Sequence, residues 1–275
     1  MRLLILAGLL ACGGLAAQGQ SLRVMTYNIR YDNAGDGINA WPQRKAELAN
    51  QVRYYGPMVL GIQEGLHHQV AYLDSALADY SYVGGGRDDG RQGGEYSALF
   101  YATAAWELLE EGQFWLSPTP DRPSQGWDAA LPRIATWAKL RYAETGETWA
   151  IINTHFDHQG EQARLESAKM LRAFANGMES QGYKVVLMGD LNATPEQEPI
   201  RELRRGLADT ESLTANPAFG PGGTFGGWNA GEPVARRIDY VWVGGGIAVL
   251  KYGVLSDSRD GRYYSDHLPV LVELQ

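Results

Sequence analysis

The sequence predicts an α/β protein in which two packed sheets are covered by helices. Short strand-like runs follow one another along the chain, and amphipathic helical stretches separate only some of them. The chain has 275 residues, of which 44% are hydrophobic and 20% charged, so a sizeable core can be buried. It contains no long linker, repeat or low-complexity tract. We therefore expect a single domain over residues 20–275, preceded by a leader.

Residues 1–19 have the layout of a secretory signal peptide. Arg2 precedes an apolar run that ends near Ala11, and small residues follow up to Gly19. A permanent membrane anchor needs about 20 apolar residues, so this run is too short to be one. We expect a periplasmic or secreted protein without integral membrane association. A rival interpretation makes Cys12, the only cysteine, a lipidated anchor; cleavage after residue 19 instead leaves no thiol nucleophile and no disulfide.

Buried strands are expected where apolar, β-branched and aromatic residues form short runs. In chain order these runs are Leu22–Ile29, Met58–Gln63, Tyr96–Tyr101, Ala105–Leu116, Ile134–Tyr142, Thr148–Phe156, Lys184–Leu191, Ile238–Val243, Ile247–Val254 and Leu268–Leu274. We expect Tyr96–Tyr101 to pair with Ala105–Leu116. We also expect Ile134–Tyr142 to form a hairpin with Thr148–Phe156, because a turn-forming segment with Gly146 separates them.

Helices are expected where apolar residues recur at helical spacing. These stretches are Trp41–Tyr54, Leu66–Ala78, Glu161–Gln181 and Pro199–Arg205. Pro42 suits the first turn of the first helix, where its missing N–H donor is not needed. The glycine-rich segments 84–94 and 220–231 are expected to be loops, which carry sites more often than strands do.

Polar residues stand at strand ends where a core-forming strand has no need of them. They are Asn28, Glu64, His155, Asp190, Asn192, Asp239, Asp266 and His267. Taken singly, each has a simple structural explanation: Glu64 could open a helix, Asp190 could form a turn, and His155 could be a hydrogen-bonded core residue. Side chains two apart on a strand share a face, so Asp190 and Asn192 point the same way. If the strand ends converge, one cleft collects the whole set.

Such a cleft would hold four carboxylates, two imidazoles and two amides. Bringing so many acids together is costly unless a cation is present. Oxygen-rich ligands without a thiol suit Mg²⁺ or Mn²⁺ better than zinc. A hard cation of this kind is typically held by one or two carboxylates and by phosphate oxygens of the substrate. The set therefore favours a metal site for phosphate chemistry.

Short motifs that carry these residues appear in order along the chain. They are TYNIR, GIQE, NTHFDH, GDLNATP, RRIDYVWV and SDHLPV, and they extend from Asn28 to His267. Together they resemble the endonuclease/exonuclease/phosphatase superfamily of divalent-metal phosphoesterases. The resemblance implies a four-layered α/β/β/α sandwich, in which two mostly antiparallel sheets pack face to face with helices outside. It also implies a site at one rim of the two sheets.

The resemblance implies that Glu64 is the metal carboxylate, with Asn28 and Asp266 helping to hold the ion. Asp190 resembles the aspartate that orients or deprotonates the attacking water. Asn192, on the same face, would bind that water or a phosphate oxygen. The cofactor implied by this set is Mg²⁺ or Mn²⁺.

The two histidines resemble those that meet the phosphate in this superfamily. Asp239 would fix the tautomer of His267 and support its charged form, and His155 would donate to the phosphate. Attack on phosphorus builds negative charge on the oxygens, which a metal and imidazolium donors stabilise. Water attacks directly, so no covalent nucleophile is needed, in agreement with the lack of a Gly-x-Ser-x-Gly motif.

Three further residues are candidates for substrate binding. Arg133 stands just before a strand and would bind a second phosphate, or else form a surface ion pair. Asp157 and His158 extend the His155 motif to NTHFDHQG, which resembles a bacterial subgroup of the superfamily. They would shape the substrate or metal site.

Charge limits the choice of substrate. The chain has 24 Lys and Arg residues against 32 Asp and Glu, a formal net charge of −8, and an acidic protein repels polyanions. We expect a monomeric hydrolase for a small phosphorylated or nucleotide-like substrate. Two alternatives stay open: a nuclease for single-stranded DNA or RNA, and a non-catalytic module that binds phosphate or glycan on the same fold.

Overall fold

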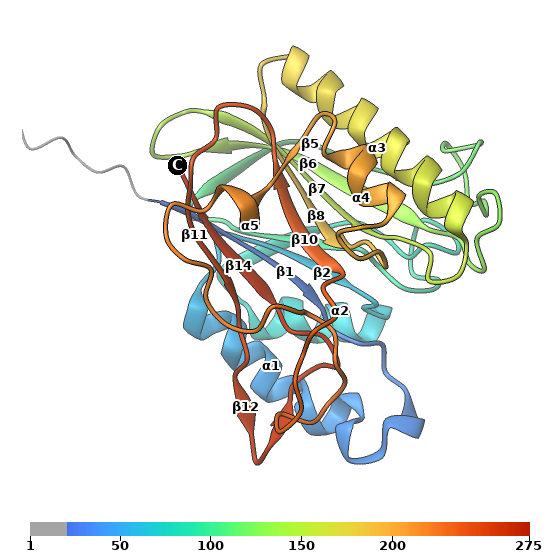
Figure 1. Cartoon of the computed structure of the whole chain (residues 1–275), viewed down its shortest axis with the longest axis vertical. Helices are drawn as coiled ribbons and strands as arrows, with labels where there is room; N and C mark the ends of the chain where they lie inside the picture. Colours follow the sequence, from blue (N-terminus) through green and yellow to red (C-terminus); the bar gives the residue numbers. More distant parts are fainter. Residues whose placement is uncertain (1–20) are drawn as a thin grey trace, which may run out of the picture.

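The computed structural model describes residues 21–275 and shows two six-stranded sheets packed face to face (Figure 1). Helices cover the outer side of each sheet, which gives the four layers α/β/β/α. The predicted fold class is therefore confirmed. The predictions for the leader 1–19 and for Cys12 lie outside the described residues. Within residues 21–275, no helix combines the length and the apolar character that a membrane crossing requires.

The first sheet joins strands from both ends of the chain, in the order β11-β14-β1-β2-β4-β3. Within it, β1 and β2 run parallel and the other neighbours run antiparallel. The strands are β1 Leu22–Asn28, β2 Val59–Gln63, β3 Tyr80–Val83, β4 Leu99–Ala102, β11 Val249–Val254 and β14 Val270–Leu274.

The second sheet comes from the middle of the chain, in the order β5-β6-β7-β8-β10-β9. Here β7 and β8 run parallel and the other neighbours antiparallel. The strands are β5 Trp106–Trp115, β6 Ile134–Tyr142, β7 Thr148–His155, β8 Lys184–Asp190, β9 Ala208–Asp209 and β10 Asp239–Val243. A separate short ribbon pairs β12 Ser258–Arg259 with β13 Arg262–Tyr263.

Both sheets are buried on two faces, which explains why their strands read as continuous apolar runs. In β1, Val24 faces the core between the sheets and Met25 faces the core under the helices α1 and α2. In β7, Ile151 faces the core between the sheets and Ile152 faces α3 and α4. The helices are η1 Ala34–Asn39, α1 Trp41–Tyr55, α2 His67–Ala76, α3 Glu161–Ser180, α4 Glu198–Leu203 and α5 Thr210–Leu213.

One predicted strand pairing is wrong. β4 pairs with β2 and β3 in the first sheet, whereas β5 pairs with β6 in the second. The short turn after Ala102 carries the chain from one sheet to the other, where β5 gains a nine-residue partner in place of the four-residue β4. The predicted hairpin of β6 and β7 is confirmed. The half-buried edge strand β3 was not predicted.

Strand direction and register bring the polar strand ends to one rim. β1 and β2 run parallel, so their last residues Asn28 and Gln63 lie side by side. β7 and β8 also run parallel, which places His155 beside Asp190. The antiparallel β10 begins where β8 ends, so Asp239 lies opposite Asp190. The predicted convergence of these strand ends is therefore present.

A seam of amide groups joins the two sheets directly below this rim. Gln63 Nε2 donates to Asn153 Oδ1 at 2.7 Å, and Asn153 Nδ2 donates to the Ile62 carbonyl at 2.8 Å. A Cβ atom on Gly61 would lie 2.8 Å from Asn153 Cγ, so only glycine allows this close approach. Directed hydrogen bonds therefore fix how the sheets face each other beside the site.

Candidate active site

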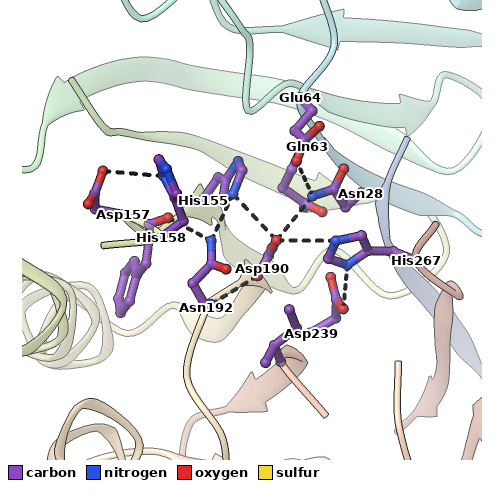
Figure 2. Close-up of polar contacts among 12 residues, drawn as sticks. Asn28, Gln63, Glu64, His155, Asp157, His158, Asp190, Asn192, Asp239 and His267 are labelled. Carbon is purple, nitrogen blue, oxygen red and sulfur yellow. Dashed lines mark hydrogen bonds and ion pairs between the residues drawn. The ribbon is translucent and has the colours of Figure 1, made fainter. Parts of the chain in front are cut away.

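The carboxylate of Asp190 lies at the centre of the site (Figure 2). Its Oδ2 atom accepts a hydrogen bond from Asn28 Nδ2 at 3.0 Å. The same atom lies 3.4 Å from His155 Nε2 and 3.7 Å from His267 Nε2. Burial and the neighbouring carboxylate on β10 raise the pKa of Asp190 above that of an ordinary aspartate. A carboxylate with a raised pKa is suited to accept a proton at neutral pH.

Glu64 follows β2 and reaches Asp190 from the first sheet. Its backbone is left-handed, with φ 64°, a conformation that residues with a Cβ atom rarely adopt. Its Oε1 atom accepts from Asn28 Nδ2 at 3.0 Å, and its Oε2 atom accepts from the Tyr31 N–H at 3.1 Å. The Oδ1 atom of Asn28 accepts from the Arg30 N–H at 3.0 Å. Asn28 therefore links two carboxylates that come from different sheets.

The two histidines of the site are driven to opposite protonation states. His267 Nδ1 lies 2.9 Å from Asp239 Oδ2. Burial would lower the pKa of His267, but the carboxylates of Asp239 and Asp190 raise it well above its ordinary value. Burial lowers the pKa of His155 well below its ordinary value, and nearby arginines lower it further. Environments that separate the pKa values of two histidines in this way make one, here His267, a proton donor and leave the other, here His155, neutral.

Asn192 also has a left-handed backbone, with φ 44°. Its Nδ2 atom donates to the Phe156 carbonyl at 3.0 Å and lies 3.1 Å from His155 Nε2. Since an amide N–H donates, this contact favours the His155 tautomer with its proton on Nδ1. The predicted donation from His155 to phosphate then requires either protonation of the ring or exchange of the Asn192 amide atoms. The backbone N–H of Asn192 donates to Asp190 Oδ1 at 2.9 Å.

The donor atoms of the site fit a divalent cation. Glu64, His155 and Asp190 form one group whose ligand atoms lie within 4.8 Å of one another, and Asp190, Asp239 and His267 form another. Asp239 Oδ1 is buried and has no hydrogen-bond partner among the described residues. The carboxylates thus carry more negative charge than their neighbours compensate. His267 is already paired with Asp239, so the first group is better placed to hold an ion. When bound, such an ion polarises a phosphoryl oxygen and stabilises its developing charge.

Glu64, His155, Asp190, Asn192 and His267 form the floor of a cavity of about 560 Å³. These five lie together as predicted for residues of one cleft, whereas Asn28 and Asp239, predicted with them, do not line it. Its walls are lined by Arg30, Tyr31, Glu95, Leu131, Arg133, His158, Phe225, Arg236, Ile238 and Asp266. The wall arginines make this part of an acidic protein attractive to a phosphate group.

Arg133 lies in the cavity wall and is only 4% exposed. Its Nε atom donates to Asp157 Oδ2 at 3.3 Å, and its Nη2 atom lies 3.0 Å from His158 Nδ1. Its Nη1 atom is buried and has no partner within residues 21–275. Arg133 therefore does form an ion pair, with Asp157, but the pair is buried beside the site and not at the surface.

Asp157 lies behind the wall rather than in it. Its side chain does not line the cavity, and it accepts hydrogen bonds from the backbone N–H groups of Ala130, Leu131 and Gly160. Burial raises its pKa, but these donors and the Arg133 charge outweigh that effect and lower the pKa to about 2. Its acceptor atoms are occupied, so Asp157 positions Arg133. The expectation that it binds substrate directly is corrected accordingly.

Asp266 lines the cavity beside His267. Its carboxylate lies 3.9 Å from Arg30 Nε, and burial raises its pKa. Asp266 belongs to neither group of clustered donor atoms, so its predicted contribution to metal binding stays a prediction. Arg30 also pairs with Asp36, at 3.1 Å from Nε to Oδ2.

Sequence reasoning missed a largely buried ion pair beside His155. Arg87 donates to both carboxylate oxygens of Glu95, at 2.7 and 2.9 Å. Glu95 Oε2 lies 3.9 Å from His155 Nδ1 and lines the cavity. Both charges lie in or next to the glycine-rich loop 84–94, where the sequence pattern gives no reason to expect burial. Only the path of the loop brings them to the site.

Arg44 of α1, also missed, ties together the segments that carry the site. It is 5% exposed, and its guanidinium carbon lies 5.1 Å from the ring centroids of Trp41 and Trp228. Its N–H groups donate to four backbone carbonyls, those of Ile29 at 2.6 Å, Arg30 at 2.7 Å, Asn39 at 2.9 Å and Tyr264 at 3.1 Å. Two of these carbonyls directly follow Asn28, and another closely precedes His267. Arg44 therefore acts on the site as a positioning residue.

The fold and the site together define a hydrolase of phosphoric esters. Residues 25–267 match the model of the Endonuclease/Exonuclease/phosphatase family, and the chain belongs to this family. A structure of a family member from Bacteroides thetaiotaomicron shows 37% identity and a TM-score of 0.88, covering 93% of this chain and 97% of that one. A mannosyl-6-phosphatase from the same organism shows 37% identity and a TM-score of 0.87, covering 93% of this chain and all of that one, 100%.

More distant structures share the fold alone. The catalytic domain of human Nocturnin, solved with a sulfate anion, shows 20% identity and a TM-score of 0.71, covering 93% of each chain. No curated protein matched the sequence.

Proposed function

We propose that this chain is a Mg²⁺- or Mn²⁺-dependent phosphatase that removes the phosphate group from small sugar phosphates. The observation that carries this proposal is the cavity of about 560 Å³ with Asp190, His155 and His267 on its floor. A cavity of this size suits a small molecule, whereas a polymer needs an open track. Arg30 and Arg133 in its walls offer the positive charge that a phosphomonoester requires.

The roles of the residues follow from their contacts. Asp190 takes the proton from a water as its oxygen attacks phosphorus, because burial raises the pKa of this carboxylate. His267, kept cationic by Asp239, donates from Nε2 to a phosphate oxygen. The bond between phosphorus and the alcohol oxygen breaks, and the leaving oxygen takes up a proton from solvent, so that the sugar leaves as its alcohol. Glu64 would hold the cation, which supplies further charge stabilisation when bound.

A relative supports the substrate class. The mannosyl-6-phosphatase of Bacteroides thetaiotaomicron is 37% identical and is covered over its whole length, 100%. A hexose 6-phosphate is a phosphomonoester of a primary alcohol, small enough for the cavity described above. The acidic net charge of −8 acts against a long polyanion as substrate.

The proposal is tested by assaying purified protein with Mg²⁺ or Mn²⁺ against hexose phosphates, inositol phosphates, nucleotides, phospholipids and single-stranded oligonucleotides. We expect phosphate release from hexose phosphates, loss of release with a chelator, and recovery when the ion is restored. Preferred cleavage of oligonucleotides would instead support the nuclease alternative. Absence of turnover on every ester would support the non-catalytic binding module.

A matched pair of variants tests the assigned residues. Asp190→Asn keeps the shape of the side chain but removes the base, so we expect turnover to fall by at least about 10²-fold. Asp74→Asn makes the same change on an exposed carboxylate of α2 and should leave turnover unaltered. An active Asp190→Asn variant would remove Asp190 from the role of base.

A further inference from the structure

An aromatic ring and a cation form one wall of the cavity directly beside His267. The Phe225 ring lies 4.7 Å from the His267 ring, between centroids, at an interplanar angle of 52°. The guanidinium carbon of Arg236 lies 5.5 Å from the centroid of the Phe225 ring. Both side chains line the cavity. We call Phe225 and Arg236 the ring wall.

The backbone holds the ring wall in place between two segments that carry catalytic residues. Phe225 forms isolated β-bridges with Arg236 and with His267. The Thr224 hydroxyl accepts from the backbone N–H groups of Ile238 and Asp239, at 3.0 and 3.1 Å. The Thr224 carbonyl accepts from the Leu268 N–H at 2.7 Å. The position of Phe225 is therefore fixed relative to Asp239 and His267, although it belongs to a glycine-rich loop.

Glycine is required for this arrangement at one point. A Cβ atom on Gly223 would lie 2.4 Å from the carbonyl carbon of Ala235, which is closer than any side chain allows. The loop therefore lies directly against the segment that carries Arg236. Phe225 and Arg236 are neighbours in space because the backbone itself makes the contact, not because two flexible side chains happen to meet.

Arg236 differs from the other arginines around the site in having no acidic partner. Arg30 pairs with Asp36, and Arg133 pairs with Asp157. The adjacent Arg237 points away into a buried pair with Asp209. Arg236 takes part in no ion pair within residues 21–275, and its side chain is exposed at the cavity edge. Its N–H donors are therefore available to a ligand.

The ring wall does not have the chemistry of a second phosphate site. One face of it is the apolar ring of Phe225, which offers no hydrogen-bond donor. The reacting phosphate belongs at the cavity floor, where Asp190 and His267 lie. A group bonded to that phosphate extends toward the ring wall. There it contacts both the apolar ring of Phe225 and the N–H donors of the Arg236 guanidinium. A pyranose ring offers the complement, with C–H groups on one face and hydroxyls around its edge.

We infer that Phe225 and Arg236 bind the sugar ring of the substrate and make the enzyme select hexose phosphates over ring-free phosphomonoesters. This inference rests on the proposed function and concerns the substrate selectivity of the same cavity. The C–H face of the sugar lies against Phe225, and Arg236 donates N–H groups to ring hydroxyls. Leu131, which is 36% exposed, also lines the cavity and adds apolar surface to it.

The test compares a phosphomonoester that carries a sugar ring with one that carries none. Hexose 6-phosphates and glycerol 3-phosphate are both phosphomonoesters of primary alcohols, so their bond-breaking chemistry is matched. We expect kcat/KM of the natural sequence to favour the hexose ester. Phe225→Ala and Arg236→Gln should each lower kcat/KM for the hexose ester about tenfold more than for glycerol 3-phosphate. Phe225→Leu, which keeps apolar volume, replaces the alanine variant in the test if that variant does not fold. Its ratio of kcat/KM for the hexose ester to kcat/KM for glycerol 3-phosphate should lie between those of the natural sequence and the Arg236→Gln variant.

Two control variants fix the baseline. Phe219→Ala removes a ring that is 70% exposed and does not line the cavity, and Arg122→Gln removes an exposed arginine elsewhere on the surface. Neither control should change the ratio of the two kcat/KM values. Thermal unfolding of every variant, followed by circular dichroism, identifies those that are folded.

Each other outcome overturns the inference. Equal losses on both esters would show that Phe225 acts through His267 rather than on the sugar. Losses confined to a nucleoside 5′-monophosphate, with the hexose ratio unaltered, would assign the wall to a nucleobase. Absence of hydrolysis of any hexose phosphate by the natural sequence would overturn the proposed function and this inference with it, whereas hydrolysis with an unaltered ratio overturns the inference alone.

Discussion

Replacement of Arg44 by lysine should destabilise the protein and loosen the site at the same time. Lysine keeps the charge but has one nitrogen, which cannot reach all four carbonyls that the guanidinium binds. Each buried carbonyl left without a partner costs about 1–3 kcal/mol. With two or more carbonyls released and the contacts to two indole rings weakened, we expect the free energy of unfolding to fall by about 3–5 kcal/mol.

Urea unfolding of the natural sequence, Arg44→Lys and Arg53→Lys measures this loss. Arg53 is the matched control, because it lies on the same helix α1 and is exposed, with hydrogen bonds from Nη1 to the Ala76 carbonyl at 2.7 Å and from Nη2 to Asn50 Oδ1. Its replacement should cost less than about 1 kcal/mol. Titration of the folded Arg44→Lys variant with Mn²⁺ should show weakened binding, because Arg44 holds the backbone that follows Asn28.

A change of less than about 1 kcal/mol in Arg44→Lys would refute the reasoning on stability. Unaltered Mn²⁺ affinity and unaltered kcat in a clearly destabilised variant would refute the positioning role. In that case the contacts of Arg44 would stabilise the domain without influence on the site.

Three further changes have expected outcomes. Asp157→Asn should lower the free energy of unfolding by about 1–2 kcal/mol at neutral pH. Because folding lowers the Asp157 pKa to about 2, the difference in unfolding free energy from the natural sequence should shrink as pH falls from about 4 toward 2. A difference that does not depend on pH would contradict this. Glu95→Gln should lower kcat by about 10- to 100-fold with little change in KM, because it leaves His155 facing two arginines; an unaltered kcat would remove Glu95 from a role at the site. Mass spectrometry of protein from the periplasm or medium should find a chain that starts at Gln20, whereas a lipid-modified Cys12 at the N-terminus would establish the anchored alternative.

The main strands could be predicted because both faces of each sheet are covered. Val24 and Met25 are neighbours that point into different cores, so β1 appears in the sequence as an uninterrupted apolar run. Pairing was harder to predict, because apolar runs define strands but not their partners. The chain changes sheets within the few residues between Ala102 and Trp106, which a hairpin would also fit. The edge strand β3 has half-buried residues and no apolar run to indicate it.

The catalytic floor could be predicted for a different reason. Asp190 and His155 end strands whose other residues are apolar, so their polarity stands out at these positions. Asp157 has the same appearance in the sequence, yet backbone donors occupy its carboxylate and direct it to Arg133. Glu95 and Phe225 come from glycine-rich loops, whose paths depend on contacts with distant segments. The contributions of Glu95 and Phe225 to the walls were therefore not accessible to sequence reasoning.

The amide seam between Gln63 and Asn153 has a consequence for when the chain becomes active. Asn28 and Glu64 come from one sheet and Asp190 and Asp239 from the other, so neither sheet contains the complete active site by itself. Apolar contacts alone would let the two sheets slide over each other, and the hydrogen bonds of the seam prevent this. A chain that is still being synthesised, or is held unfolded, therefore has no hydrolase activity. Activity requires that the last strand has docked and that the two sheets are packed together.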